Sequence, residues 1–67
     1  MNQSADHPGR RLLKVKPAAA YLSISPQSLR ALVQSQQLPI VKLADRGPWL
    51  LDVKDLDQFI EGRKEYA

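Results

Sequence analysis

The sequence has no cysteine, so disulfides and thiolate metal sites are excluded. Its only histidine is His7, and it contains neither a glycine-rich phosphate loop nor clustered metal ligands. No apolar run is long enough to span a membrane, and the N-terminal residues lack the apolar segment of a signal peptide. We therefore expect a cytoplasmic protein with no catalytic site, no cofactor, no small-molecule substrate and no membrane contact.

The chain is small and modestly basic. It has 67 residues, and ten lysines and arginines against seven aspartates and glutamates give a net charge of +3. A chain of this length buries only about 60% of its unfolded surface, so it forms one small domain that depends on an efficient core. The positive charge mildly favours polyanionic partners. The densest cationic cluster, which is either simply solvated or in contact with phosphates, is Arg10, Arg11, Lys14 and Lys16.

The stretch from Ser25 to Gln36 predicts the helix around which the function is organised. Ser25 is a favourable N-cap, and Pro26 suits the first helical position. In a helical projection the apolar side is made of Leu29, Leu32, Val33 and Gln36. The polar side is made of Gln27, Ala31 and Gln34, flanked by Ser28, Arg30 and Ser35. Amides and arginine pair with base edges in the major groove, so this side is either a DNA-reading face or an ordinary solvated one.

A first helix is predicted over residues 16–22, before this central one. Pro17 suits its first turn, and the three alanines that follow are strong helix formers. Residues 23–25 form a tight connection, and two short helices joined in this way match a helix-turn-helix. The apolar segment made of Leu12 and Leu13 is too short to form a strand alone, but it can add a short strand to a sheet formed later in the chain.

A β-hairpin is predicted after the central helix, which ends before Pro39. Its strands are expected over residues 40–44 and 49–51, with a turn over 45–48 and Arg46 near the tip. A two-stranded hairpin is unstable alone, so it must pack on the helices. Trp49, the only tryptophan, serves either packing or stacking on a ligand.

A third helix is predicted to begin at Asp52, whose side chain can cap it, with Asp55 adding negative charge to its first turn. Gly62 is a stop signal for this helix. Its apolar side is made of Val53, Leu56, Phe59 and Ile60. The order of elements predicts a mainly α winged helix-turn-helix with a small β-hairpin. We assign residues 1–11 to a flexible N-terminal tail, 12–62 to the domain and 63–67 to a C-terminal tail.

Several segments together resemble a known family. They are LLKVKPAAAYL at 12–22, ISPQSLR at 24–30, LPIVKL at 38–43, Trp49, and DLDQFI at 55–60. With these segments the chain resembles the excisionase-type helix-turn-helix domain, a group related to the DNA-binding domain of mercury-resistance-type regulators. The spacing of the segments is more specific than any one of them.

The resemblance implies a small bacterial, phage or mobile-element protein that binds double-stranded DNA and is associated with the nucleoid when bound. The helix from Pro26 is then expected in the major groove, and the hairpin on the backbone or in the minor groove. Arg30 matches an arginine that commonly meets phosphate. Other copies of the chain or a site-specific recombinase are the further partners implied, in a role that either directs recombination or regulates transcription.

The chain departs from the family pattern at several positions. Lys14 replaces the usual hydroxyl cap, so the first helix is expected to start less sharply, and Ser23 replaces the common glycine of the turn, so strain is expected there. Residues that are often basic in relatives are here Gln27, Ala31, Gln34, Gln37, Leu50 and Asp52. This lower charge keeps an alternative open, a winged-helix protein-interaction module with little DNA affinity of its own.

Two sets of residues are therefore candidate DNA contacts. The base-facing set is Gln27, Ser28, Arg30 and Gln34. The set that contacts the backbone directly or through the wing is Arg11, Lys14, Lys16, Lys42 and Arg46. We expect the first set to determine sequence preference and the second to neutralise phosphates.

Overall fold

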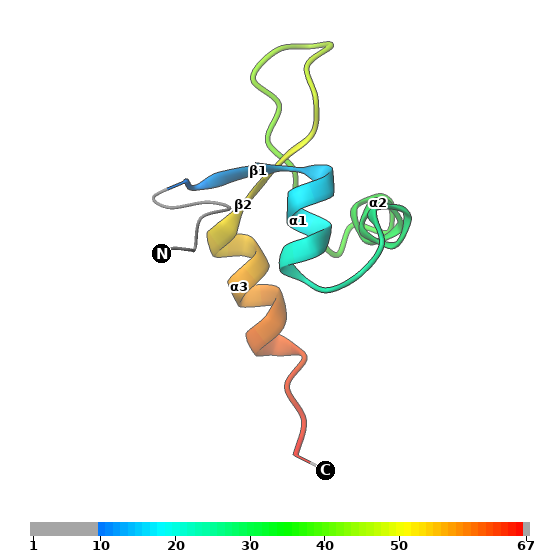
Figure 1. Ribbon diagram of the computed structural model, residues 1–67, viewed down its shortest axis with the longest axis vertical. Helices are drawn as coiled ribbons and strands as arrows, with labels where there is room; N and C mark the ends of the chain where they lie inside the picture. The colour runs from blue at the N-terminus through cyan, green and yellow to red at the C-terminus, as the bar shows by residue number, and fades with distance from the viewer. Residues whose placement is uncertain (1–9, 67) are drawn as a thin grey trace.

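The computed structural model describes residues 10–66, so His7, most of the predicted N-terminal tail and the last residue lie outside the described part (Figure 1). Its elements are β1 (Leu12–Lys14), α1 (Val15–Tyr21), α2 (Pro26–Gln34), β2 (Leu50–Asp52) and α3 (Val53–Gly62). Within residues 10–66, no helix has both the length and the apolar character needed to cross a membrane. The predicted fold class, a mainly α winged helix-turn-helix with a small β element, is confirmed.

The sheet joins the two ends of the domain. β1 pairs antiparallel with β2, and Leu13 lies opposite Leu51 at the centre of the pairing. The leucine pair at positions 12 and 13 therefore joins a sheet formed by a later strand, as expected. Because β1 leads into α1 and β2 leads into α3, this pairing fixes where both helices begin.

The predicted strand over residues 40–44 is wrong. Only one bridge forms there, between Val41 and Leu50, with N–O distances of 2.7 and 3.0 Å between their backbone groups. In an antiparallel ladder the next hydrogen-bonding positions on either side fall on Pro48 and Pro39, which have no backbone N–H to donate. The segment from Ile40 to Trp49 is consequently an open loop closed at its base by the bridge, and we call it the wing. In Figure 1 it extends away from the helices, beyond the sheet.

The predicted start of α2 is confirmed. Ser25 is its N-cap, and the Ser25 hydroxyl oxygen accepts a hydrogen bond from the backbone N–H of Ser28 at 3.0 Å. Pro26 occupies the first helical turn, where its missing N–H leaves no bond unmade. By contrast, α1 starts at Val15, and its N-cap Lys14 makes no side-chain capping bond. This agrees with the expected effect of replacing a hydroxyl cap.

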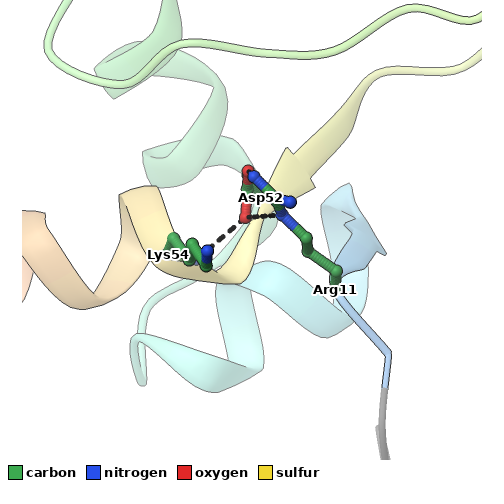
Figure 2. A network of polar contacts seen from close by, with 3 residues as sticks. All are labelled: Arg11, Asp52 and Lys54. Carbon is green, nitrogen blue, oxygen red and sulfur yellow. Dashed lines mark hydrogen bonds and ion pairs between the residues drawn. The ribbon is translucent and has the colours of Figure 1, made fainter.

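The start of α3 is held by a small polar network (Figure 2). The Asp52 carboxylate accepts from the backbone N–H of Lys54 at 3.0 Å and so caps the helix. It also accepts three hydrogen bonds from the Arg11 guanidinium, two from Nε at 3.1 and 3.0 Å and one from Nη2 at 2.9 Å. The carbonyl of Arg11 accepts from the N–H of Val53 at 2.8 Å. Arg11 is thereby attached to α3 through both its backbone and its side chain.

Two residues without glycine's freedom adopt left-handed backbone conformations. Ser23 has φ of 60°, which is the strain expected for a serine in place of a glycine. Gln36 has φ of 64°, and the sequence analysis missed this. Because α2 ends at Gln34, the helical projection does not extend to Gln36, whose side chain is exposed rather than on the apolar side.

The core is small and made largely of leucine. Its buried residues are Leu13, Ala18, Ala19, Leu29, Leu38, Leu51 and Leu56. Ala18 and Ala19 let α2 approach α1 closely, and Figure 1 shows α1 between α2 and α3. At the end of α1 the Tyr21 hydroxyl donates to Asp57 at 2.6 Å and ties α1 to α3. This hydrogen bond raises the pKa of Tyr21.

Candidate nucleic-acid interface

The outer face of α2 is polar and free of carboxylates. Leu29 is fully buried, which fixes the rotation of the helix about its axis. The side chains of Gln27, Arg30 and Gln34 are exposed, as the helical period predicts. These three residues of the predicted base-facing set therefore lie together on the exposed side of α2. Their amides and guanidinium offer the donors and acceptors that pair with purine edges.

Ser28, the fourth residue of that set, is placed differently. Its hydroxyl accepts a hydrogen bond from the Ser25 hydroxyl at 2.9 Å, so it takes part in the cap of α2. It also lines an apolar groove on the side of α2 away from Arg30, together with Ile24 and Leu32. Ser28 is exposed but lies at the edge of the polar face.

A second hollow lies on the other flank of α2, where three parts of the chain meet. It has a volume of about 420 Å³, and we call it the basic hollow. Its described lining residues come from the β1–α1 junction, from α2 and from the second half of the wing, and they are Lys14, Val15, Lys16, Arg30, Gly47, Pro48 and Trp49. The basic hollow thus brings Lys14 and Lys16, which were predicted to contact phosphates, together with Arg30, which was predicted to face the bases.

The charge of the basic hollow is of one sign. Lys14, Lys16 and Arg30 are all exposed, and none of them forms an ion pair with a residue in the range 10–66. The described lining residues include no carboxylate. Cations without internal partners attract a polyanion more strongly than paired ones, because no protein carboxylate has to be displaced.

The wing adds two cations that do not line the hollow. Lys42 and Arg46 are exposed, and the wing turns back near Arg46, where the N–H of Gly47 donates to the carbonyl of Ala44 at 3.0 Å. Leu43, between these cations, is 76% exposed. Both cations belong to the wing, which projects away from the helices (Figure 1).

Arg11 differs from the other predicted backbone contacts because its charge is already paired. Its ion pair with Asp52 has an N–O distance of 2.9 Å, and its side chain is 64% exposed. The hydrogen bond and the charge of Arg11 lower the pKa of Asp52, with a further contribution from the N–H of Lys54. The same pairing raises the pKa of Arg11. The structure therefore gives Arg11 a structural role at the start of α3.

The apolar groove beside Ser28 was missed by the sequence analysis. It has a volume of about 620 Å³ and lies between the end of α1, α2 and α3. Phe59 and Ile60, which the helical period places on the apolar side of α3, line it and remain half-buried. The Arg63 guanidinium lies 4.6 Å from the centre of the Phe59 ring and donates to the Gln37 side chain. The position of α1 between α2 and α3 explains why this space stays open.

Residues 10–66 contain no group of three or more histidine, cysteine, aspartate or glutamate side chains placed to hold a metal ion. The candidate site is thus an arrangement of amides, hydroxyls and cations on a helix face, a hollow and a loop.

Comparison with known proteins gives one match. A family model described as a helix-turn-helix domain matches residues 12–64, which include every helix and strand of the structure. Neither the curated proteins nor the solved structures contain a match.

Proposed function

Because the chain belongs to the excisionase-like family of helix-turn-helix domains and is a DNA-binding protein of that kind, we propose that it binds double-stranded DNA in a sequence-specific way. One observation carries this proposal above all. The carboxylate-free outer face of α2 lies directly beside the basic hollow, and Arg30 belongs to both. A reading surface next to a phosphate-binding surface is what a helix in the major groove requires.

The two surfaces have different roles in this proposal. Gln27 and Gln34 contact base edges, because an amide can pair with both the N6 and the N7 of adenine. Arg30, on the flank of α2, contacts either a base edge or the adjoining phosphate. The residues that neutralise phosphates are Lys14, Lys16, Lys42 and Arg46, with Arg11 in a secondary position because of its bond to Asp52.

The proposal is tested by fluorescence anisotropy of labelled duplexes titrated with the protein. One duplex comes from the DNA flanking the gene, and the other is of random sequence. We expect tighter binding to the flanking duplex and a steep loss of affinity with salt. Gln34→Ala is expected to relax base preference at one position, whereas Lys42→Ala weakens binding to all sequences alike. Equal weakening of every sequence by both variants would contradict this division of roles.

The finer biological role is proposed from the family. The protein acts in the cytoplasm, either as a recombination directionality factor that bends or marks DNA for excision, or as a transcriptional regulator. Its protein partners are other copies of the chain or a site-specific recombinase. An excision assay with and without the protein, beside a reporter assay of the neighbouring promoter, separates the two roles.

A second candidate function is a protein-interaction module, and the apolar groove favours it. The groove is lined by apolar side chains such as Phe59 and Leu32, and also by the cations Arg63 and Lys64. A partner segment with apolar side chains and carboxylates fits this combination. If neither duplex binds at low salt, this second function replaces the first.

A further inference from the structure

Trp49 is one of the residues that line the basic hollow. It is the only tryptophan of the chain and is partly buried at the base of the wing. Its indole N–H makes no hydrogen bond to any residue in the range 10–66. Since every buried polar side-chain atom in that range has a partner, this N–H is not buried. The N–H is thus a donor still available to a ligand.

The lining of the hollow combines two kinds of surface. Lys14, Lys16 and Arg30 supply positive charge, while Trp49 and Pro48 supply an apolar wall. A free inorganic anion needs only the first kind. A sugar-phosphate backbone presents anionic phosphates alternating with deoxyribose rings, and it is complementary to both kinds at once.

We propose that the basic hollow holds one strand of the DNA backbone, with the Trp49 indole packed against a deoxyribose and the cations on the flanking phosphates. This inference rests on the proposed function and adds a contact that is independent of base sequence. The position of the hollow beside α2 also agrees with this proposal. A strand that borders the major groove runs beside a helix lying in that groove, and Arg30 joins the exposed face of α2 to the hollow.

The first test uses the unaltered protein. Emission from the single tryptophan is recorded while random-sequence duplex DNA is added, and quenching by iodide is compared before and after saturation. Binding is followed independently by the anisotropy of a label on the DNA. We expect DNA to protect Trp49 from iodide along the same titration curve as the anisotropy. Anisotropy that saturates while tryptophan emission and quenching stay unchanged overturns this inference and leaves DNA binding intact.

Inorganic phosphate at matched ionic strength identifies what the hollow recognises. We expect it to leave iodide quenching of Trp49 nearly unchanged, because it has no sugar ring to cover the indole. Protection by inorganic phosphate equal to that by DNA overturns the sugar contact and leaves a simple anion site. An absence of any DNA binding at low salt removes the proposed function and this inference together.

A pair of variants gives a second, independent test. Trp49→Leu is expected to weaken binding to all duplexes by about tenfold, with no change in base preference, because a backbone contact carries no sequence information. Leu43→Ala is the matched control, since Leu43 is exposed on the same wing but does not line the hollow. Circular dichroism checks that both variants fold. Equal weakening by the two variants assigns the effect to the wing in general and overturns the inference.

Discussion

The salt dependence of DNA binding follows from a count of unpaired cations on the proposed interface. The structure places five cations there without an internal carboxylate partner in the range 10–66, and they are Lys14, Lys16, Arg30, Lys42 and Arg46. Each phosphate neutralised contributes about −0.9 to the slope of log affinity against log salt, so five contacts predict a slope near −4.5. Raising salt from about 50 to about 200 mM then weakens binding about 500-fold.

Two single-charge variants check that the slope arises from the named surface. Lys42→Ala removes a cation from the wing and is expected to reduce the slope by about 0.9. Lys54→Ala removes the same charge from an exposed position on α3, outside the hollow and the wing, and is expected to leave the slope unchanged. The assay is a series of anisotropy titrations with random-sequence duplex at four or more salt concentrations. A wild-type slope shallower than about −2, or equal effects of the two variants, would refute the reasoning.

Three further predictions concern the parts of the fold that hold this surface in place. Ser25→Ala removes the cap of α2 and is expected to lower the free energy of unfolding by about 1 kcal/mol and Tm by about 4–8 °C in a thermal circular-dichroism melt; an unchanged Tm would mean that the cap contributes nothing. Ser23→Gly relieves a left-handed serine and is expected to raise the free energy of unfolding by about 0.5–1 kcal/mol in urea titrations, whereas a loss of stability would show that the serine is unstrained. Asp52→Asn keeps a capping side chain but removes the charge paired with Arg11. Because the pKa of Asp52 is lowered in the fold, its contribution is fully present above the unfolded carboxyl value near 3.9 and is lost as pH falls through the folded value. The variant is therefore expected to be less stable than wild type at pH 7, with a difference that shrinks as pH falls below the unfolded carboxyl value of about 3.9; a stability difference independent of pH would contradict this.

Helix starts were predictable from the sequence because their signals are local. Ser25 followed by Pro26 marks the start of α2, and Asp52 marks the start of α3, each within a few residues of the helix it begins. The buried side of α2 was likewise predictable from its period as far as Val33. The prediction failed at Gln36, because a helical projection holds only while the backbone remains helical.

The open structure of the wing could not be predicted from local signals, because it depends on which residues pair at its base. Pro39 and Pro48 are visible in the sequence, but their effect depends on Val41 lying opposite Leu50. Only that alignment puts both prolines at the hydrogen-bonding positions of the ladder. β-branched residues made the segment resemble a strand, and the missing backbone donors prevented it from becoming one.

The composition of the site also depends on contacts between distant segments. Arg11 and Asp52 are 41 residues apart in the chain, so no local pattern could show that Arg11 is paired. The basic hollow forms only after β1 has paired with β2 and α2 has packed on α1, which bring Lys16, Arg30 and Trp49 to one place. Lys14, Lys16 and Arg30 were predicted from the sequence as DNA contacts, but no local pattern connects them with Trp49.

The distribution of charge, rather than its net value, supports the orientation proposed for the domain on DNA. A net charge of +3 is too small to distinguish a DNA-binding protein from many others. Most of the described carboxylates, however, lie on β2 and α3, where Asp52 pairs with Arg11, Asp57 accepts from Tyr21 and Glu61 pairs with Lys64. Five of the cations that form no ion pair within residues 10–66 lie on the hollow and the wing, where Asp45 is the one carboxylate, and α2 has no carboxylate at all. Since charges interact strongly only within about 10 Å at moderate salt, a phosphate at the hollow experiences mainly the positive side. We therefore expect α3, which has a net negative charge, to lie on the side away from DNA when α2 is in the major groove.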